Sequence, residues 1–194
     1  MSLANVGVIH GRFQPIHIGH MEYLLAGKSR CKTLIIGIAN PDPSLTSHTP
    51  LCPERSAPGA NPFTYYERML MIKESLVEAG VSRRKFEIVP FPVNRPELLS
   101  HYVPFDAPFY LTIYDEWGRE KLKTFKLLGI KTEVMWERNM TDRITTGTVI
   151  RKLMAEGKKW QSLVPPAVGR IIRTLGLDRR VAEAVFLQGE LLGS

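Results

Sequence analysis

The chain has 194 residues, a formal net charge of +7 and a hydrophobic fraction of 44%, a composition typical of a globular protein with one sizeable core. Its apolar runs are too short to span a bilayer, its start lacks the pattern of a signal peptide, and its two cysteines lack disulfide or metal-ligand spacing. We therefore expect one cytoplasmic domain over residues 1–194, with no membrane partner. Its core is expected at about 4–160 and a helical segment at 161–194.

The positive charge is concentrated in the C-terminal part of the chain. Residues 1–118 contain 11 basic and 11 acidic side chains, whereas residues 119–180 contain 15 basic and 6 acidic ones. Such a field attracts a polyphosphate substrate as well as a nucleic acid. Because no aromatic side chains are interleaved with the basic ones, we expect no specific nucleic-acid partner.

Apolar runs alternate with helical patterns along the chain. Nearly continuous apolar residues predict buried parallel strands at 6–9, 33–39, 86–91, 109–113 and 132–136. Helical patterns, several ending at a glycine, occur at 21–28, 64–79, 116–128, 148–155, 166–175 and 178–192. Residues 40–62 are rich in Pro, Ser, Thr and Gly and predict a long surface loop. This order predicts a doubly wound parallel α/β sheet of the Rossmann type, followed by C-terminal helices.

The segment after the first strand contains the residues most informative about function. It has the sequence GRFQPIHIGH over residues 11–20 and leads into the first helix. The beginning of a helix offers unpaired N–H groups and the positive end of its dipole to an anion. His17 and His20 add side-chain donors, and Gly19 lets a phosphate approach the backbone. This segment therefore predicts a phosphate-binding site.

A second candidate phosphate contact lies near the C-terminal end of the predicted sheet. Thr146, Gly147 and Thr148 precede a predicted helix, where hydroxyl and backbone groups can donate to a phosphate. Arg151, one turn further on, can add a charge-assisted hydrogen bond to the same anion.

The two motifs together resemble those of the archaeal-type nicotinamide mononucleotide (NMN) adenylyltransferases, in the H-x-G-H nucleotidyltransferase superfamily. The resemblance also includes NPFT at 61–64 followed by Glu67-Arg68, and GKKW at 157–160 leading to LVP at 163–165. It covers roughly the first 175 residues. It implies transfer of AMP from ATP to a phosphate-bearing acceptor, NMN in the first instance, with release of pyrophosphate and formation of NAD.

The resemblance also implies roles for individual residues. It gives catalytic roles to His17, His20, Arg12 and Arg151, and nucleotide contacts to Gly11, Phe13, Gln14, Gly19, Thr146, Gly147 and Thr148. The acceptor itself attacks the α-phosphorus, so the protein positions the groups and neutralises charge. Mg²⁺ is expected as the cofactor, held by the triphosphate and water without a dedicated protein metal site.

Three stretches depart from the family pattern, and each concerns the acceptor. Residues 96–102 lack the tryptophan that stacks on nicotinamide in the family, and His101 or Tyr102 could replace it. The turn after the fourth strand, Gly-Asn in the family, is bulky here and lies beside Trp117. The loop at 40–61 is longer than in the family and either reshapes the pocket or is an inert excursion. We take His101, Tyr102 and Trp117 as candidate acceptor contacts.

Other functions remain open at this point. A cytidylyltransferase, an adenylyltransferase for another phosphorylated small molecule, and a nucleotide sensor without activity are each compatible with the phosphate motifs. A class I aminoacyl-tRNA synthetase shares H-I-G-H, but the chain has no K-M-S-K-S loop and no room for a domain that reads tRNA. The apolar stripe of the last helix, Val181, Val185 and Leu192, fits either a homo-oligomer interface or the chain's own core.

Overall fold

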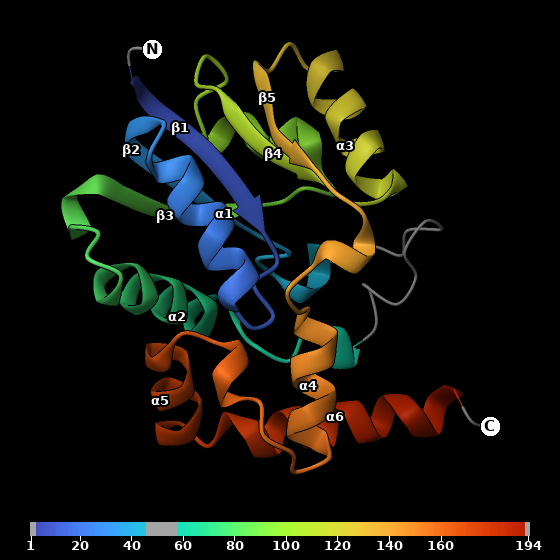
Figure 1. Cartoon of the computed structure of the whole chain (residues 1–194). Helices are drawn as coiled ribbons and strands as arrows, with labels where there is room; N and C mark the ends of the chain where they lie inside the picture. Colours follow the sequence, from blue (N-terminus) through green and yellow to red (C-terminus); the bar gives the residue numbers. More distant parts are fainter. Residues whose placement is uncertain (1–2, 46–57, 193–194) are drawn as a thin grey trace.

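A computed structural model describes residues 3–45 and 58–192 of the chain. Its centre is a sheet of five parallel strands in the order β3-β2-β1-β4-β5, shown in Figure 1. The strands are β1 (Ala4–Gly11), β2 (Cys31–Ala39), β3 (Phe86–Phe91), β4 (Phe109–Ile113) and β5 (Thr132–Glu137). This order confirms the predicted doubly wound sheet and places a topological switch point between β1 and β4.

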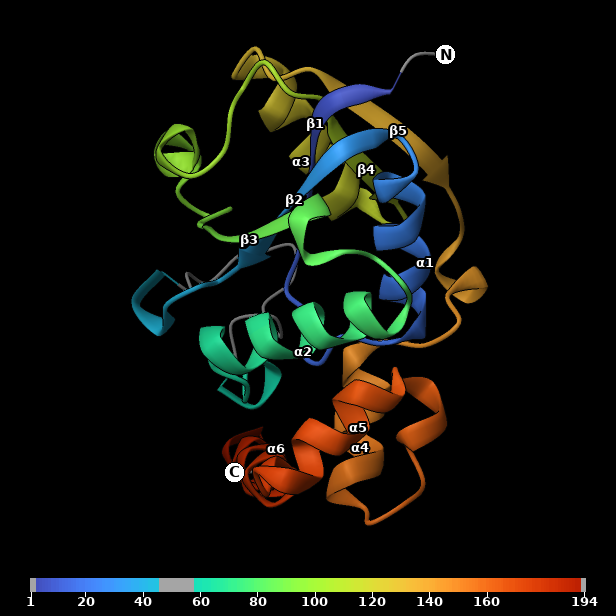
Figure 2. The same cartoon turned by 90° about the vertical axis from the view of Figure 1, so that its left-hand side faces the viewer.

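Helices cover both faces of the sheet, as Figures 1 and 2 show. They are α1 (Ile18–Lys28), α2 (Tyr65–Glu78), α3 (Glu116–Leu127), α4 (Gly147–Ala155), α5 (Pro166–Thr174) and α6 (Leu177–Leu192). The side chain of Ile9 packs in a core cluster with residues of α1 and α2, while its neighbour Val8 packs in a second cluster with Phe125 of α3. Both residues of β1 are fully buried, because alternate side chains of a central strand enter opposite layers.

The ends of the helices follow the capping signals in the sequence. Thr64 and Glu67 form a capping box at the start of α2, which satisfies two backbone N–H groups there. Gly80, Gly129 and Gly157 have φ values of 82°, 72° and 64° directly after helices, a conformation that costs least for glycine.

The predicted elements differ from the observed ones mainly at their boundaries. Strand β1 extends to Ala4 and Gly11, beyond the predicted 6–9, because polar residues at strand ends carry no apolar signal. Residues 96–101, which belong to none of the predicted helices and strands, form a 3₁₀ helix. The predicted loop contains short 3₁₀ helices at Pro43–Leu45 and Pro58–Ala60. Its residues 46–57 lie outside the described part of the chain.

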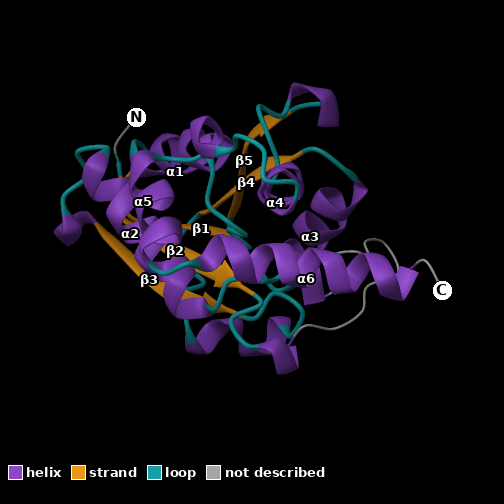
Figure 3. Ribbon diagram, turned by 90° about the horizontal axis from the view of Figure 1, so that it is seen from below, coloured by secondary structure: helices purple, strands orange, loops and turns teal. Residues whose placement is uncertain are grey.

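The C-terminal helices extend the core on the α1 face, and Figure 3 shows α6 lying across α4. Val181 of α6 is fully buried and Val185 packs partly against the same cluster. Both therefore pack on the chain's own core, whereas the side chain of Leu192 lies outside the described residues. A homo-oligomer remains a prediction. No helix in the described ranges is long and apolar enough to cross a membrane.

Candidate active site

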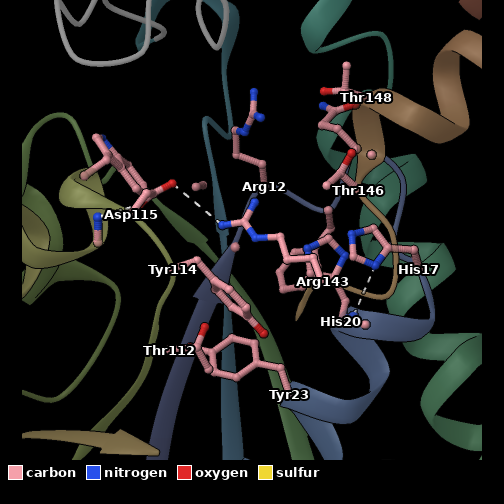
Figure 4. A pocket seen from close by; sticks show the side chains of 18 of the residues that line it. Arg12, His17, His20, Tyr23, Thr112, Tyr114, Asp115, Arg143, Thr146 and Thr148 are labelled. Atoms are coloured by element: carbon pink, nitrogen blue, oxygen red, sulfur yellow. Dashed lines mark hydrogen bonds and ion pairs between the residues drawn. The ribbon is translucent and has the colours of Figure 1, made fainter. Parts of the chain in front are cut away.

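A cavity of about 380 Å³ lies at the carboxyl ends of the strands, which is where open α/β sheets bind their ligands. The segment between β1 and α1 forms one wall, and the start of α3 and the segment between β5 and α4 form others. Figure 4 shows side chains from these segments pointing toward one another across the cavity. The two predicted phosphate motifs therefore lie at one site.

His17 and His20 are held together at the beginning of α1. His17 is the N-cap residue of α1, and its Nδ1 accepts a hydrogen bond from the backbone N–H of His20 at 3.2 Å. The two imidazole rings are stacked, with centroids 3.6 Å apart, as Figure 4 shows. Because Nδ1 of His17 is an acceptor, the neutral ring carries its proton on Nε2. Nε2 of His17 is then a donor for an anion.

Both histidines are neutral near pH 7. Burial, with a smaller contribution from Arg143, lowers the pKa of His17 to about 4. Burial also lowers the pKa of His20 well below 6.5, and the neighbouring His17 and Arg12 lower it further. A bound polyphosphate would favour the protonated rings and raise both pKa values.

We expect acid to destabilise the fold below about pH 6.5. Burial lowers the pKa of His10, His17 and His20, so the unfolded chain binds protons that the folded chain does not. Stability is full above the unfolded pKa of 6.5 and falls as the pH decreases toward 4, with His17 contributing about 3 kcal/mol to the complete fall. Urea-denaturation midpoints measured between about pH 7 and pH 5, where exposed carboxylates stay ionised, test this expectation.

The matched variant for that titration is His17→Asn, because asparagine is also a good N-cap residue. Its midpoint should depend less steeply on pH than that of the wild-type protein. A wild-type midpoint that stays level over this range would contradict the expectation.

Arg151 joins the two motifs, although it lies 137 residues from Gln14 in the sequence. Its Nη1 donates to the carbonyl oxygen of Gln14 at 2.6 Å, and its Nη2 donates to Oγ1 of Thr148 at 3.3 Å. Gly147 is required between them, because a Cβ at that position would lie 2.4 Å from the same carbonyl oxygen. Thr146 caps α4 by accepting from the N–H of Val149.

Two buried side chains, those of Gln14 and Arg68, hold the segment between β1 and α1 through hydrogen bonds with the backbone. Gln14 donates to the carbonyl of Phe63 and accepts from its N–H, both at 2.9 Å. Arg68 donates to the carbonyl oxygens of Arg12, Ala39 and Asn40 at 2.7–2.9 Å. The amide of Gln14 is thus engaged by the backbone of Phe63, and its predicted contact with a nucleotide remains a prediction. Arg68 follows Glu67 in the family motif, and its hydrogen-bond acceptors here are all backbone carbonyls.

The remaining predicted nucleotide contacts lie around the same segment. Phe13 is fully buried and presents its ring edge to His20, with centroids 4.9 Å apart. Gly11, Arg12 and Gly19 line the cavity, and Figure 4 shows Arg12 projecting into it.

A group of bulky side chains occupies the turn after β4, where the resembled family has Gly-Asn. The Tyr114 hydroxyl accepts from Nε1 of Trp136 at 3.1 Å, and the Arg143 guanidinium lies 4.4 Å from the Tyr114 ring centroid. Asp115 caps α3 and pairs with Arg143 at 3.7 Å. In Figure 4, Arg143 lies between Asp115 and the two histidines. The altered turn is visible in the sequence, whereas the place of Arg143 depends on the path of the chain after β5.

The predicted acceptor contacts do not all reach the cavity. Trp117 lines it, whereas His101 and Tyr102 are exposed and do not. Neither residue is therefore in position to replace the family's stacking tryptophan at this cavity, and their role as acceptor contacts stays a prediction. The reason is the 3₁₀ helix at Pro96–His101, which buries Leu99 against the α3-side core and leaves its end exposed to solvent.

The described residues contain no group of three or more histidine, cysteine or carboxylate side chains placed to hold a metal ion. Carboxylates that line the cavity are engaged elsewhere: Glu22 pairs with Arg138, and Asp142 accepts from the backbone of Asn139.

Sequence comparison identifies the class of protein that this fold and site define. Residues 8–153 match the cytidylyltransferase-like family. A phosphonoformate cytidylyltransferase from Streptomyces viridochromogenes is 53% identical over 92% of this chain and 96% of its own length. A nicotinamide-nucleotide adenylyltransferase from Thermococcus onnurineus is 34% identical over 89% of this chain and 85% of its own length.

Structural comparison agrees on the fold. A bifunctional NMN adenylyltransferase/ADP-ribose pyrophosphatase from Francisella tularensis matches with a TM-score of 0.65 and 15% identity over 99% of this chain. The chain spans 57% of the length of that protein. A second structure of the Francisella protein contains AMP and a manganese ion.

The chain belongs to the cytidylyltransferase-like family and is a nucleotidyltransferase. The expected membership of the nucleotidyltransferase superfamily is confirmed, but the particular branch is not. The identities favour the cytidylyltransferase alternative over NMN adenylyl transfer.

Proposed function

We propose that the protein transfers CMP from CTP to a small phosphonate acceptor, phosphonoformate, and releases pyrophosphate. The observation that carries this proposal is the 53% identity to a phosphonoformate cytidylyltransferase over nearly the whole of both chains. The next relatives, which act on nicotinamide nucleotide by name, are about one third identical.

Two features of the cavity support this choice. Tyr114 and Arg143 add bulk at the turn after β4, which favours the single ring of cytosine over the double ring of adenine. No aromatic side chain from Pro96–His101 lines the cavity, so this stretch offers no platform for a nicotinamide ring. A small acceptor needs none.

The reaction follows from the groups at the site. An oxygen of the acceptor phosphonate attacks the α-phosphorus of CTP, the bond between the α-phosphorus and its bridging oxygen breaks, and pyrophosphate leaves with the bonding electrons. A phosphonate dianion carries no proton on the attacking oxygen, so the neutral His17 and His20 serve as hydrogen-bond donors to the phosphates, not as bases. Arg12 and Arg151, which line the cavity, neutralise the charge of the leaving group in this proposal.

Mg²⁺, carried by the triphosphate, would supply further neutralisation of the charge on pyrophosphate. The engaged carboxylates of the cavity fit this arrangement, because the nucleotide and water would provide the ligands.

Pyrophosphate release with Mg²⁺ tests the proposal in four combinations: CTP or ATP, each with phosphonoformate or NMN. CTP with phosphonoformate should be turned over at least about 100-fold faster, as kcat/KM, than ATP with NMN, because polar groups that fit one base and acceptor are left unpaired by another. Faster turnover of ATP with NMN would overturn the proposal in favour of NAD synthesis. Binding of CTP without turnover of either acceptor would favour the nucleotide sensor.

A further inference from the structure

His10, at the carboxyl end of β1, is a buried polar residue at the cavity wall. Its side chain is 6% exposed and lines the cavity. Neither ring nitrogen has a hydrogen-bond partner among the described residues. An imidazole buried in this way is costly to the fold, since a donor and an acceptor lose water and gain nothing. An unsatisfied group of this kind in a cavity wall points to a ligand.

The packing around His10 fixes the orientation of the ring but gives its nitrogens no hydrogen-bond partner from the described part of the chain. The ring stacks on Phe91 with centroids 4.6 Å apart, and Phe125 meets it edge-on at 5.3 Å. An aliphatic or aromatic side chain would fill the same space without the polar cost. Rotation of the ring by 180° exchanges each nitrogen with a carbon, so the ring can present a nitrogen to the cavity while it stays in the stack.

His10 lies on the opposite face of the sheet from the phosphate motif. Its neighbour Ile9 packs toward α1, whereas His10 packs with Phe91 and Phe125 on the α3 side. A cation on this side is Lys121 of α3, which acts electrostatically on His10 and lies 4.0 Å from the ring centroid of Trp117. His10, Trp117 and Lys121 all line the cavity. This side of the cavity therefore offers a positive charge and an imidazole without a hydrogen-bond partner among the described residues, the groups that an acid group of a ligand requires.

We propose that His10 is an acceptor-binding residue, which donates a hydrogen bond to the carboxylate of the acceptor while the phosphonate faces the α-phosphorus of CTP. This inference rests on the proposed function. Phosphonoformate carries its carboxylate directly on phosphorus, so a donor close to the attacking group is required to hold it. Lys121 provides the charge beside this contact, and His10 selects acceptors that carry a second acid group.

Steady-state kinetics of His10→Leu provide the test. Leucine keeps an apolar side chain of similar size between the two phenylalanines but removes the donor. The KM for phosphonoformate should rise about 10- to 100-fold, the effect of losing one hydrogen bond to a charged group. The KM for CTP should stay within about twofold. His10→Gln, which retains a donor, should recover part of the loss.

The matched control is Phe125→Leu, which perturbs the same cluster and leaves the imidazole in place. Its KM for phosphonoformate should stay within about threefold of the wild-type value. An unchanged acceptor KM in His10→Leu, in a protein that turns over CTP and phosphonoformate normally, overturns the inference and leaves the proposed function intact. Absence of wild-type turnover overturns the proposed function instead.

Imidazole ¹⁵N NMR of the wild-type protein gives a second readout, independent of the folding of any variant. Phosphonoformate added to the complex with α,β-methylene-CTP should shift the ring nitrogen signals of His10, because one nitrogen acquires a hydrogen-bonded anion. Signals that do not move when the acceptor is saturating contradict the inference.

Discussion

Replacement of His20 by alanine is expected to lower kcat by about 10²–10³-fold while the protein stays folded. His20 Nδ1 is buried and makes no hydrogen bond with the described residues, so the change breaks no internal hydrogen bond of that nitrogen. The ring stacks on His17 and meets the edge of Phe13, a geometry that fixes it toward the cavity. Loss of the ring removes a hydrogen-bond donor that stabilises the charge developing on the phosphates in the transition state. Pyrophosphate release at saturating CTP and acceptor measures the effect.

The control for this variant is Leu25→Ala, a truncation on the more exposed side of the same helix. It should retain kcat within about twofold, and both variants should melt within a few degrees of the wild-type protein. A His20→Ala enzyme that keeps more than about a third of the wild-type kcat would remove His20 from the mechanism.

Arg151→Lys is expected to lower kcat/KM for CTP by about 100-fold or more, and the free energy of unfolding by about 1–3 kcal/mol. A lysine can replace only one of the two contacts that Arg151 makes, to the Gln14 carbonyl and to Thr148. Burial lowers the pKa of Arg151 to about 10, which leaves the guanidinium charged at pH 7. The same burial would bring a lysine, whose ordinary pKa is lower, closer to neutrality.

Arg170→Lys is the matched control, because Arg170 is an exposed residue of α5 that pairs with Glu78 away from the cavity. It should change neither kcat/KM nor the urea midpoint appreciably, as expected for a surface ion pair. If Arg151→Lys were as active and as stable as Arg170→Lys, the bridge between the two motifs would have no role in catalysis or in the fold.

Most of the fold could be predicted because its signals are local. The strands at 86–91 and 109–113 have the bounds that the sequence indicates, since buried parallel strands are continuous apolar runs. The helices after the first lie within one residue of their predicted bounds, whereas α1 begins at Ile18, three residues before the predicted start. The 3₁₀ helix at Pro96–His101 was missed because it has too few residues for periodicity to register, and its single buried residue is Leu99.

The residues proposed to contact phosphate could be identified from the sequence, whereas most of the other side chains at the cavity could not. His17, Gly19 and Thr146 lie at the beginnings of helices, where residue type and position alone predict an anion. The contacts of His10, Tyr114 and Arg143 involve residues far apart in the chain. His10 lines the cavity, whereas His101 lies on an exposed 3₁₀ helix. This difference depends on the paths of the two backbone segments.

Local sequence signals thus predict the parallel α/β sheet, which the structure confirms, and a phosphate site after its first strand, because periodicity, caps and helix beginnings act over a few residues. Only the tertiary structure decided which side chains complete the cavity. It brought Arg151 onto the carbonyl of Gln14 and left His101 and Tyr102 outside the cavity. It also enclosed His10 without a hydrogen-bond partner among the described residues. These are contacts between segments distant in the chain, and packing of the whole core, not local propensity, sets their geometry.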